Sequence, residues 1–138
     1  MACYSGSFSL KTSGRDDIHD ITQQVEEQAL TSGIKNGLAC IFVVGSTAAV
    51  TTVEYEPGLV KDLQDAMDRL YPKDIDYDHQ KRWGDGNGHS HVRASMIGAS
   101  LSVPVKDGNL VLGTWQQIVF LELDVRARNR EIIVQIIG

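Results

Sequence analysis

The chain has 138 residues, of which 42% are hydrophobic and 22% charged, and its formal net charge is -5. This length and composition predict one globular domain, residues 1–138, with one hydrophobic core. The negative charge argues against a nucleic-acid or acidic-membrane binder, although a local arginine pocket for a small phosphate ester stays compatible with it. No signal peptide precedes the first residues and no stretch is apolar enough to span a bilayer, so we expect a cytoplasmic protein.

The N-terminal third predicts a strand followed by a helix. Apolar and polar residues alternate over Tyr4–Thr12, which is typical of a strand with one buried face. A turn is expected at residues 13–17, rich in glycine and aspartate. Asp20 then has the position of a helix N-cap, with Gln23 as its capping-box partner, and Gly33 is expected to end that helix.

The middle of the chain predicts two strands and a second helix. The apolar run Gly37–Val44 suits a strand buried on both faces, and Ala49–Glu54 a further strand. Pro57 fits the first turn of a helix. The apolar stripe that follows has the spacing of an amphipathic helix: Leu59, Leu63, Met67 and Leu70.

The rest of the chain predicts a long polar loop, a short helix and a β-rich end. The loop covers residues 73–88, and loops of this length are often functional. The helix is expected over His89–Gly98. Strands follow at Ser100–Val105, Leu110–Asp124 and Arg130–Ile137, with a hairpin turn at Asp107-Gly108. This order of elements indicates an α+β fold with a mostly antiparallel sheet or sandwich.

Three of the four histidines, His79, His89 and His91, lie close together in the sequence. Imidazole is a common ligand of zinc and related ions, and three histidines with one open position form a catalytic zinc site. On a strand His89 and His91 would share a face, whereas at a helix start they diverge more. The alternative is that all three are loop histidines in a solvated segment.

Candidate carboxylates lie at the end of one predicted strand and inside another. Glu54 and Glu56 precede Pro57, where they act either as anions that favour the helix dipole or as a general base. Glu122 lies inside the apolar run 118–123. A carboxylate there either faces solvent or is held by a partner, and the exposed position is the favoured one.

Two further segments have residue types that bind small anionic substrates. Arg126, Arg128 and Arg130 alternate, so on an extended segment they share one face and form either a phosphate clamp or a solvated turn. A second segment interrupts the last hairpin and is expected to line a pocket, although its tryptophan also suits the core: Thr114, Trp115 and Gln116.

The chain closely resembles the YjbQ-like family, whose members are described as secondary thiamine-phosphate synthases or as uncharacterised conserved proteins. The similar segments are Asn87–Gly98, Ser100, Pro104-Val105, Asp107-Gly108, Leu112–Gln116, Glu122 and the arginine-rich closing strand. The resemblance implies about seven mostly antiparallel strands in two sheets, a β-sandwich with two or three helices. It also implies a homotrimer with sites between subunits.

The resemblance further implies metal ligands. The family's Tyr-x-His pattern falls on Tyr77 and His79, and its Ser-His or His-x-His pattern falls on His89 and His91. Many relatives carry a histidine where this chain has Gly45, which can neither bind metal nor shuttle a proton. The activity implied joins a pyrimidine diphosphate to a thiazole phosphate and releases pyrophosphate.

Two classes of function follow from these observations. The first is an enzyme with a divalent metal, zinc foremost, at His79, His89 and His91. In that enzyme Glu54 or Glu122 acts as base, and the substrate is phosphorylated and held by Arg93, Thr114, Trp115, Gln116 and Arg128. The second is a non-catalytic trimeric protein that binds a small ligand or a metal. A metal-dependent hydrolase is a third hypothesis, because an open zinc site readily makes hydroxide.

Overall fold

A computed structural model describes residues 1–14 and 16–138 as eight strands and four helices. In chain order the elements are β1 (Cys3–Lys11), β2 (Asp17–Asp20), α1 (Thr22–Ser32), β3 (Gly37–Val44), β4 (Ala48–Val53), α2 (Pro57–Leu70), α3 (Asp78–Trp83), α4 (Gly88–Ile97), β5 (Ser100–Lys106), β6 (Asn109–Leu110), β7 (Gln117–Glu122) and β8 (Asn129–Ile137). The predicted α+β fold in two antiparallel sheets is therefore confirmed, with one more strand and one more helix than expected.

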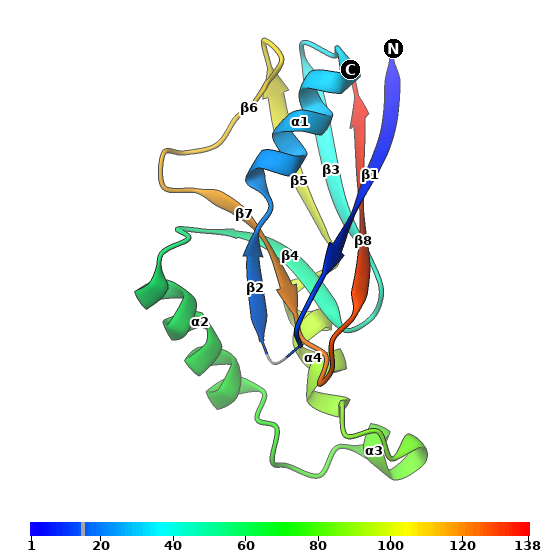
Figure 1. The fold of residues 1–138 in the computed structure, drawn as a ribbon, viewed down its shortest axis with the longest axis vertical. Helices are drawn as coiled ribbons and strands as arrows, with labels where there is room; N and C mark the ends of the chain where they lie inside the picture. Colours follow the sequence, from blue (N-terminus) through cyan, green and yellow to red (C-terminus); the bar gives the residue numbers. More distant parts are fainter. Residues whose placement is uncertain (15) are drawn as a thin grey trace.

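The strands form a five-stranded sheet in the order β1-β8-β3-β5-β6 and a three-stranded sheet in the order β2-β7-β4. Every pairing is antiparallel. In Figure 1, α1 lies over the upper part of the large sheet, while α2, α3 and α4 gather around and below the small sheet. No helix in the described ranges is long and apolar enough to cross a membrane.

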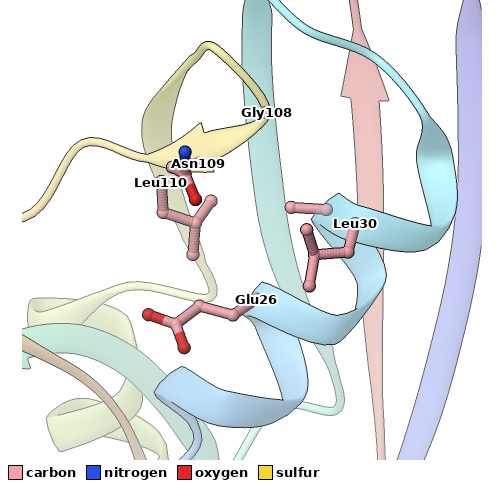
Figure 2. A pocket seen from close by; sticks show the side chains of 6 residues that line it. Glu26, Leu30, Gly108, Asn109 and Leu110 are labelled. Carbon is pink, nitrogen blue, oxygen red and sulfur yellow. The ribbon is translucent and has the colours of Figure 1, made fainter.

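Helix α1 begins and ends close to its predicted limits. Its N-cap position is Ile21, but the Asp20 carboxylate still accepts a hydrogen bond from the Thr22 backbone N–H at 3.0 Å. Gly33 ends the helix in the left-handed conformation, φ 67°, as predicted. A cavity of about 330 Å³ separates α1 from the β5–β6 turn, between Glu26 and Leu30 on one side and Leu110 on the other (Figure 2).

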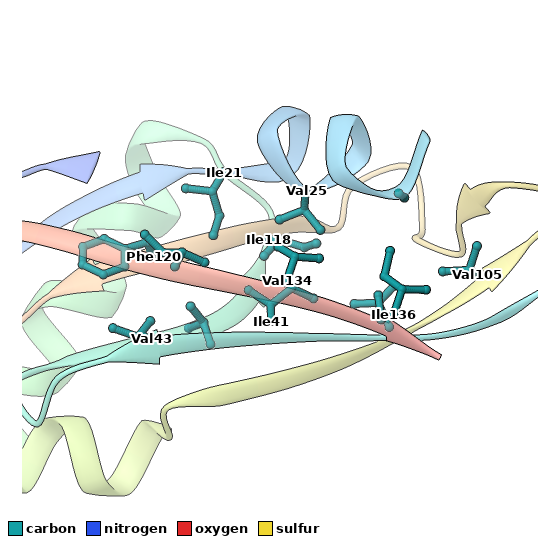
Figure 3. Close-up of a cluster of buried hydrophobic side chains, with 14 of the residues drawn as sticks. Ile21, Val25, Ile41, Val43, Val105, Ile118, Phe120, Val134 and Ile136 are labelled. Carbon is teal, nitrogen blue, oxygen red and sulfur yellow. The ribbon is translucent and has the colours of Figure 1, made fainter. Parts of the chain in front are cut away.

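The main core lies between the two sheets and beneath α1. Figure 3 shows Ile41 and Val134 of the large sheet facing Ile118 and Phe120 of β7, with Val25 of α1 closing one side. A second apolar cluster covers the other face of the small sheet, where Met67 of α2 and Ala94 of α4 contact residues of β4 and β7. Strand β7 is therefore buried on both faces, and it connects the core to the helices that carry the histidines.

Several predicted elements differ from the structure. The turn expected at 13–17 is followed at once by β2, which starts at Asp17; Arg15, inside that turn, lies outside the described residues. The expected loop 73–88 contains α3, and the expected strand Leu110–Asp124 is two strands with a loop between them. The hairpin turn is confirmed: Asp107 and Gly108 have φ values of 52° and 82°, as a two-residue turn of this kind requires.

Strand β3 is the most informative departure. Its apolar run predicts burial on both faces, but the burial alternates: Ala39, Ile41 and Val43 are fully buried, whereas Phe42 and Val44 are exposed. The outer face of the large sheet is thus apolar without being covered by this chain. The prediction of two buried faces is wrong for one isolated chain.

Candidate functional site

Two of the three predicted histidine ligands lie together between α3 and α4. His79 projects from α3 and His91 from α4, and their ring centroids are 4.5 Å apart at an interplanar angle of 57°. The loop between the helices adds a carboxylate, with Asp85 Oδ1 3.6 Å from His79 Nε2. His79 is therefore the group that both His91 and Asp85 approach.

The third histidine lies on a different side of α4. Because α4 begins at Gly88, residues 89 and 91 are separated by about 200° around the helix axis. His89 is only 3% exposed. It lines a separate cavity of about 130 Å³ together with Asp16, Lys73 and Asp124. The structure thus does not bring all three histidines to one point.

The surroundings of the His89 ring favour its neutral form. Burial lowers its pKa below the ordinary value, and the positive charges of Arg93 and Lys73 lower it further. Its Nδ1 atom is buried and meets no hydrogen-bond partner among the described residues. Such an atom costs free energy unless a ligand or water satisfies it.

Over residues 1–14 and 16–138, no three His, Cys, Asp or Glu side chains surround one point closely enough to form a metal site. The chemistry of His79, His91 and Asp85 nevertheless suits zinc and similar ions, which take imidazole nitrogen and carboxylate oxygen. A fuller set of ligands would need a small shift of side chains or a donor from a second subunit. The histidine–metal assignment stays a prediction.

Asn87 lies between Asp124 and the histidine pair, and its amide nitrogen serves one of them at a time. In one orientation the nitrogen donates to Asp124 Oδ1 at 3.4 Å; with the amide turned over, it donates instead to His79 Nε2 at 3.2 Å and to Asp85 Oδ1 at 2.9 Å. Asp124 is 2% exposed and also accepts from Thr47 Oγ1 at 3.1 Å. Sequence analysis did not identify Asp124, because its partners lie up to 77 positions away.

A second cavity, of about 200 Å³, opens beside His91 and is lined by Gly45, Ser46 and Ser95 among others. Gly45 has φ 148°, and a Cβ there would lie 2.7 Å from Arg130 Nη1. The position at which relatives are expected to carry histidine therefore borders the same cavity as His91. In this chain the positive φ and the nearby Arg130 guanidinium leave no room for a side chain there without a shift of Arg130.

Arg93 does not have the surroundings of a substrate ligand. Its side chain is 0% exposed, and its guanidinium donates to Asp16 Oδ1, to Asp68 Oδ1 and to the Tyr71 carbonyl, each at 2.9–3.0 Å. These bonds hold α4, the end of α2 and the start of β2 together. The geometry favours a structural role over the predicted substrate contact.

Glu122 is buried rather than exposed, so the favoured of its two predicted positions is wrong. Arg130 donates to both of its carboxylate oxygens, at 2.6 Å for Nη2 to Oε2 and 3.2 Å for Nε to Oε1, and the Thr12 hydroxyl donates to Oε1 at 2.7 Å. Arg130 also reaches Thr47 Oγ1 at 2.8 Å. Of the three alternating arginines, Arg130 therefore belongs to an internal ion pair rather than to a clamp on one exposed face.

Arg128 is the predicted phosphate ligand that keeps access to solvent. Its side chain is 34% exposed, and Nε and Nη2 donate to Asp124 Oδ2 at 2.9 and 2.6 Å. The remaining Nη1 protons are not used in these bonds. Arg128 thus lies beside Asp124, and its Nη1 has no hydrogen-bond partner among residues 1–14 and 16–138.

The other predicted site residues lie at the opposite end of the small sheet. Glu54 follows β4, and Thr114, Trp115 and Gln116 precede β7, where Val53 pairs with Gln117. Along six residues of strand this end is roughly 15–20 Å from Glu122 and Asp124. Trp115 is 73% exposed, so it is not in the core.

The side chains at this end of the small sheet make few hydrogen bonds, and those they make fix the local turns. The Gln116 side chain donates to Thr52 Oγ1 at 3.2 Å and accepts from the Gly113 backbone N–H at 3.0 Å, which fixes the turn. Glu56, next to Glu54, accepts from the backbone N–H groups of Gly58 and Leu59 and so caps α2, as the dipole interpretation predicted. Glu54 itself is exposed.

Comparison with known proteins gives a consistent result. The family described as UPF0047 protein YjbQ-like matches residues 6–138. A UPF0047 protein of Methanothermobacter thermautotrophicus is 40% identical over all of this chain and 94% of its own length. UPF0047 protein YugU of Bacillus subtilis is 37% identical over 96% of this chain and 98% of its own.

Solved structures agree with this assignment. A YbjQ-like protein of unknown function from Sulfolobus solfataricus P2 is 37% identical and has a TM-score of 0.89, with 99% of each chain covered. A hypothetical protein from Aeropyrum pernix K1 is 38% identical and has a TM-score of 0.90, with 98% of each chain covered. On its sequence and on its fold, the chain belongs to the UPF0047 YjbQ-like family.

Proposed function

We propose that this protein is a metal-dependent enzyme that acts on a small phosphorylated substrate. The observation that carries the proposal is the close pair of His79 and His91, with Asp85 beside His79 and the cavity bordered by Gly45 beside His91. His79 and His91 would hold the ion, Asp85 is the nearest carboxylate to His79, and zinc is the first candidate. His89, which faces the other cavity, takes no part in holding it.

The candidate reaction is the one that the family resemblance implies. A pyrimidine diphosphate reacts with the ring nitrogen of a thiazole phosphate: the bond from carbon to the diphosphate oxygen breaks, a carbon–nitrogen bond forms, and pyrophosphate leaves. A bound divalent ion would neutralise the charge that develops on the leaving pyrophosphate.

The chain's own residues would orient and hold the substrate. With its nitrogen turned toward α3, the Asn87 amide would orient the His79 ring and Asp85. The part of the Arg128 guanidinium that Asp124 leaves unused would offer donors to a phosphate oxygen. The cavity bordered by Gly45 and Ser95 gives a small ring a place beside His91.

Elemental analysis of untagged protein, purified without chelators, tests the metal. We expect about one zinc or similar ion per chain in the wild type and almost none in the His91→Ala variant, because the ion loses an imidazole ligand. His19→Ala is the matched control, since His19 lies on β2 and pairs with Asp17. Equal metal content in all three proteins, or none in the wild type, would contradict the proposed site.

Assays on the metal-loaded protein separate the activities. Formation of thiamine phosphate from the two phosphorylated precursors, lost in His91→Ala, would support the synthase. Hydrolysis of phosphate esters or lactones without synthesis would indicate a hydrolase. A ligand that raises the midpoint of thermal unfolding without being converted would indicate the binding protein instead.

We further propose that the working protein is a homotrimer joined through the outer face of the large sheet. Leu38, Phe42, Val44 and Ile137 are each more than 40% exposed there, around a hollow of about 340 Å³. A contiguous apolar face of this kind marks a protein–protein contact. A neighbouring subunit could also bring its own Glu54 and Trp115 segments toward the histidine pair, which one chain keeps apart.

Substituting Phe42→Asp is expected to dissociate the assembly, because a charge would be buried without a partner in the apolar contact. Light scattering coupled to gel filtration should give about three times the chain mass of 15.2 kDa for the wild type and one chain mass for the variant. Leu30→Asp, an exposed leucine on α1, is the control and should leave the mass unchanged. A wild type that elutes as a monomer would refute the trimer.

A further inference from the structure

The cavity on the far side of α4, lined by Asp16, Lys73, His89, Leu123, Asp124 and Val125, has about 130 Å³ of space and no role in the metal site proposed above. We propose that it binds a small oxyanion, the phosphate or carboxylate group of a metabolite, with Lys73 Nζ and His89 Nδ1 as its donors. The inference extends the proposed function only in taking the substrate to be anionic; the oxyanion site itself does not depend on the metal.

The two carboxylates of this cavity are already occupied by donors of the protein. Asp124 accepts from its neighbour's backbone N–H, from Thr47 Oγ1 and twice from Arg128. Asp16 accepts from Arg93 on one oxygen and from Lys73 on the other, at 2.9 and 3.0 Å. Asp124 therefore has little capacity left for a ligand that donates, and each Asp16 oxygen is already held by a cation.

The donors, in contrast, have capacity to spare. Lys73 has three ammonium protons, of which Asp16 takes one, and its side chain is 43% exposed. His89 is almost wholly buried, and its Nδ1 has no partner in the described part of the chain. The Ser90 hydroxyl lies 3.5 Å from the other ring nitrogen; when it donates there, the neutral ring has its proton on Nδ1.

The charged groups around the cavity are balanced. Arg93 is fully buried and shared by Asp16 and Asp68, Arg128 pairs with Asp124, and Lys73 pairs with Asp16, so three carboxylates meet three cationic side chains. Lys73 is the most exposed of these cations and has ammonium protons that Asp16 does not take. A ligand that only accepts hydrogen bonds therefore complements the groups that remain available.

Titration of metal-free wild-type protein with inorganic phosphate, and separately with acetate, tests the site by calorimetry. We expect saturable binding of at least one of the two anions, and the tighter one identifies the head group. Lys73→Met and His89→Phe, which keep the side-chain volume, should each weaken binding at least about tenfold. Lys81→Met, another lysine paired with an aspartate but far from the cavity on α3, should bind like the wild type.

Nitrogen-detected NMR of the wild-type histidines gives a second measurement that does not depend on the variants folding. Added anion should shift the His89 Nδ1 resonance and leave that of His19, on β2, unchanged. Absence of saturable binding of both anions up to about 50 mM would overturn the proposal, as would full affinity in both Lys73→Met and His89→Phe. Because the protein is metal-free, failure of the metal site leaves this result unaffected.

Discussion

Replacing Arg93 by methionine is expected to lower the free energy of unfolding by about 3–5 kcal/mol, as removal of one partner of a buried ion pair does. The guanidinium is 0% exposed and its loss would leave Asp16 buried with Lys73 alone. It would also free the Tyr71 carbonyl that ends α2. Urea denaturation followed by circular dichroism measures the change.

The matched control is Arg69→Met, which removes an exposed arginine from α2 and should change the free energy of unfolding by less than about 0.5 kcal/mol. The sequence alone assigned Arg93 to the substrate. If Arg93→Met were as stable as the wild type but bound substrate weakly, the substrate assignment would be right and the structural one wrong. The four hydrogen bonds of Arg93 to three protein residues argue for the opposite outcome.

The regular elements with a clear pattern could be predicted from the sequence. Strand β1 alternates along nine residues, and α2 follows Pro57 with an apolar stripe in which Met67 is buried and the last member, Leu70, is exposed. The missed elements are short: β2 has four residues and α3 six, too few for a periodic pattern. Helix α3 has no buried residue, so nothing in its hydrophobicity distinguishes it from a polar loop.

The sequence predicted the histidine cluster but not the directions in which its side chains point. Proximity in sequence correctly brought His79 and His91 together, but the directions of His89 and His91 depend on whether residue 88 begins a helix. Starting the helix at Gly88 sends His89 into the protein, where it meets Asp16 and Asp124 across the cavity. Those contacts join residues far apart in the chain, and no local pattern predicts them.

The outer face of the large sheet shows a prediction that fails for an informative reason. The run Gly37–Val44 has the composition of a strand with two covered faces, and the single chain covers one. Sequence composition reflects the environment of a residue in the working assembly, whereas one chain shows only its intramolecular contacts. The disagreement at Phe42 and Val44 is therefore itself support for the proposed trimer.

The Glu122–Arg130 pair is expected to give the other large effect. Arg130→Met should destabilise the protein by about 3–5 kcal/mol, because Glu122 is 0% exposed and would remain buried with only the Thr12 hydroxyl. Glu122→Gln should cost less, since the amide keeps one acceptor for the guanidinium. The free energies of unfolding of both single variants and the double variant, from urea denaturation, form a double-mutant cycle.

The cycle also decides the role of Glu122. In a buried pair the loss in the double variant is well below the sum of the single losses, since each substitution removes the same contact. Arg126→Met, on the exposed turn nearby, is the control and should change stability little. If the losses in the cycle were additive and Glu122→Gln abolished turnover without changing stability, Glu122 would again be the candidate catalytic base. Strong coupling would instead leave Glu54, exposed at the far end of the small sheet, as the predicted base, which a second subunit would have to bring to the histidines.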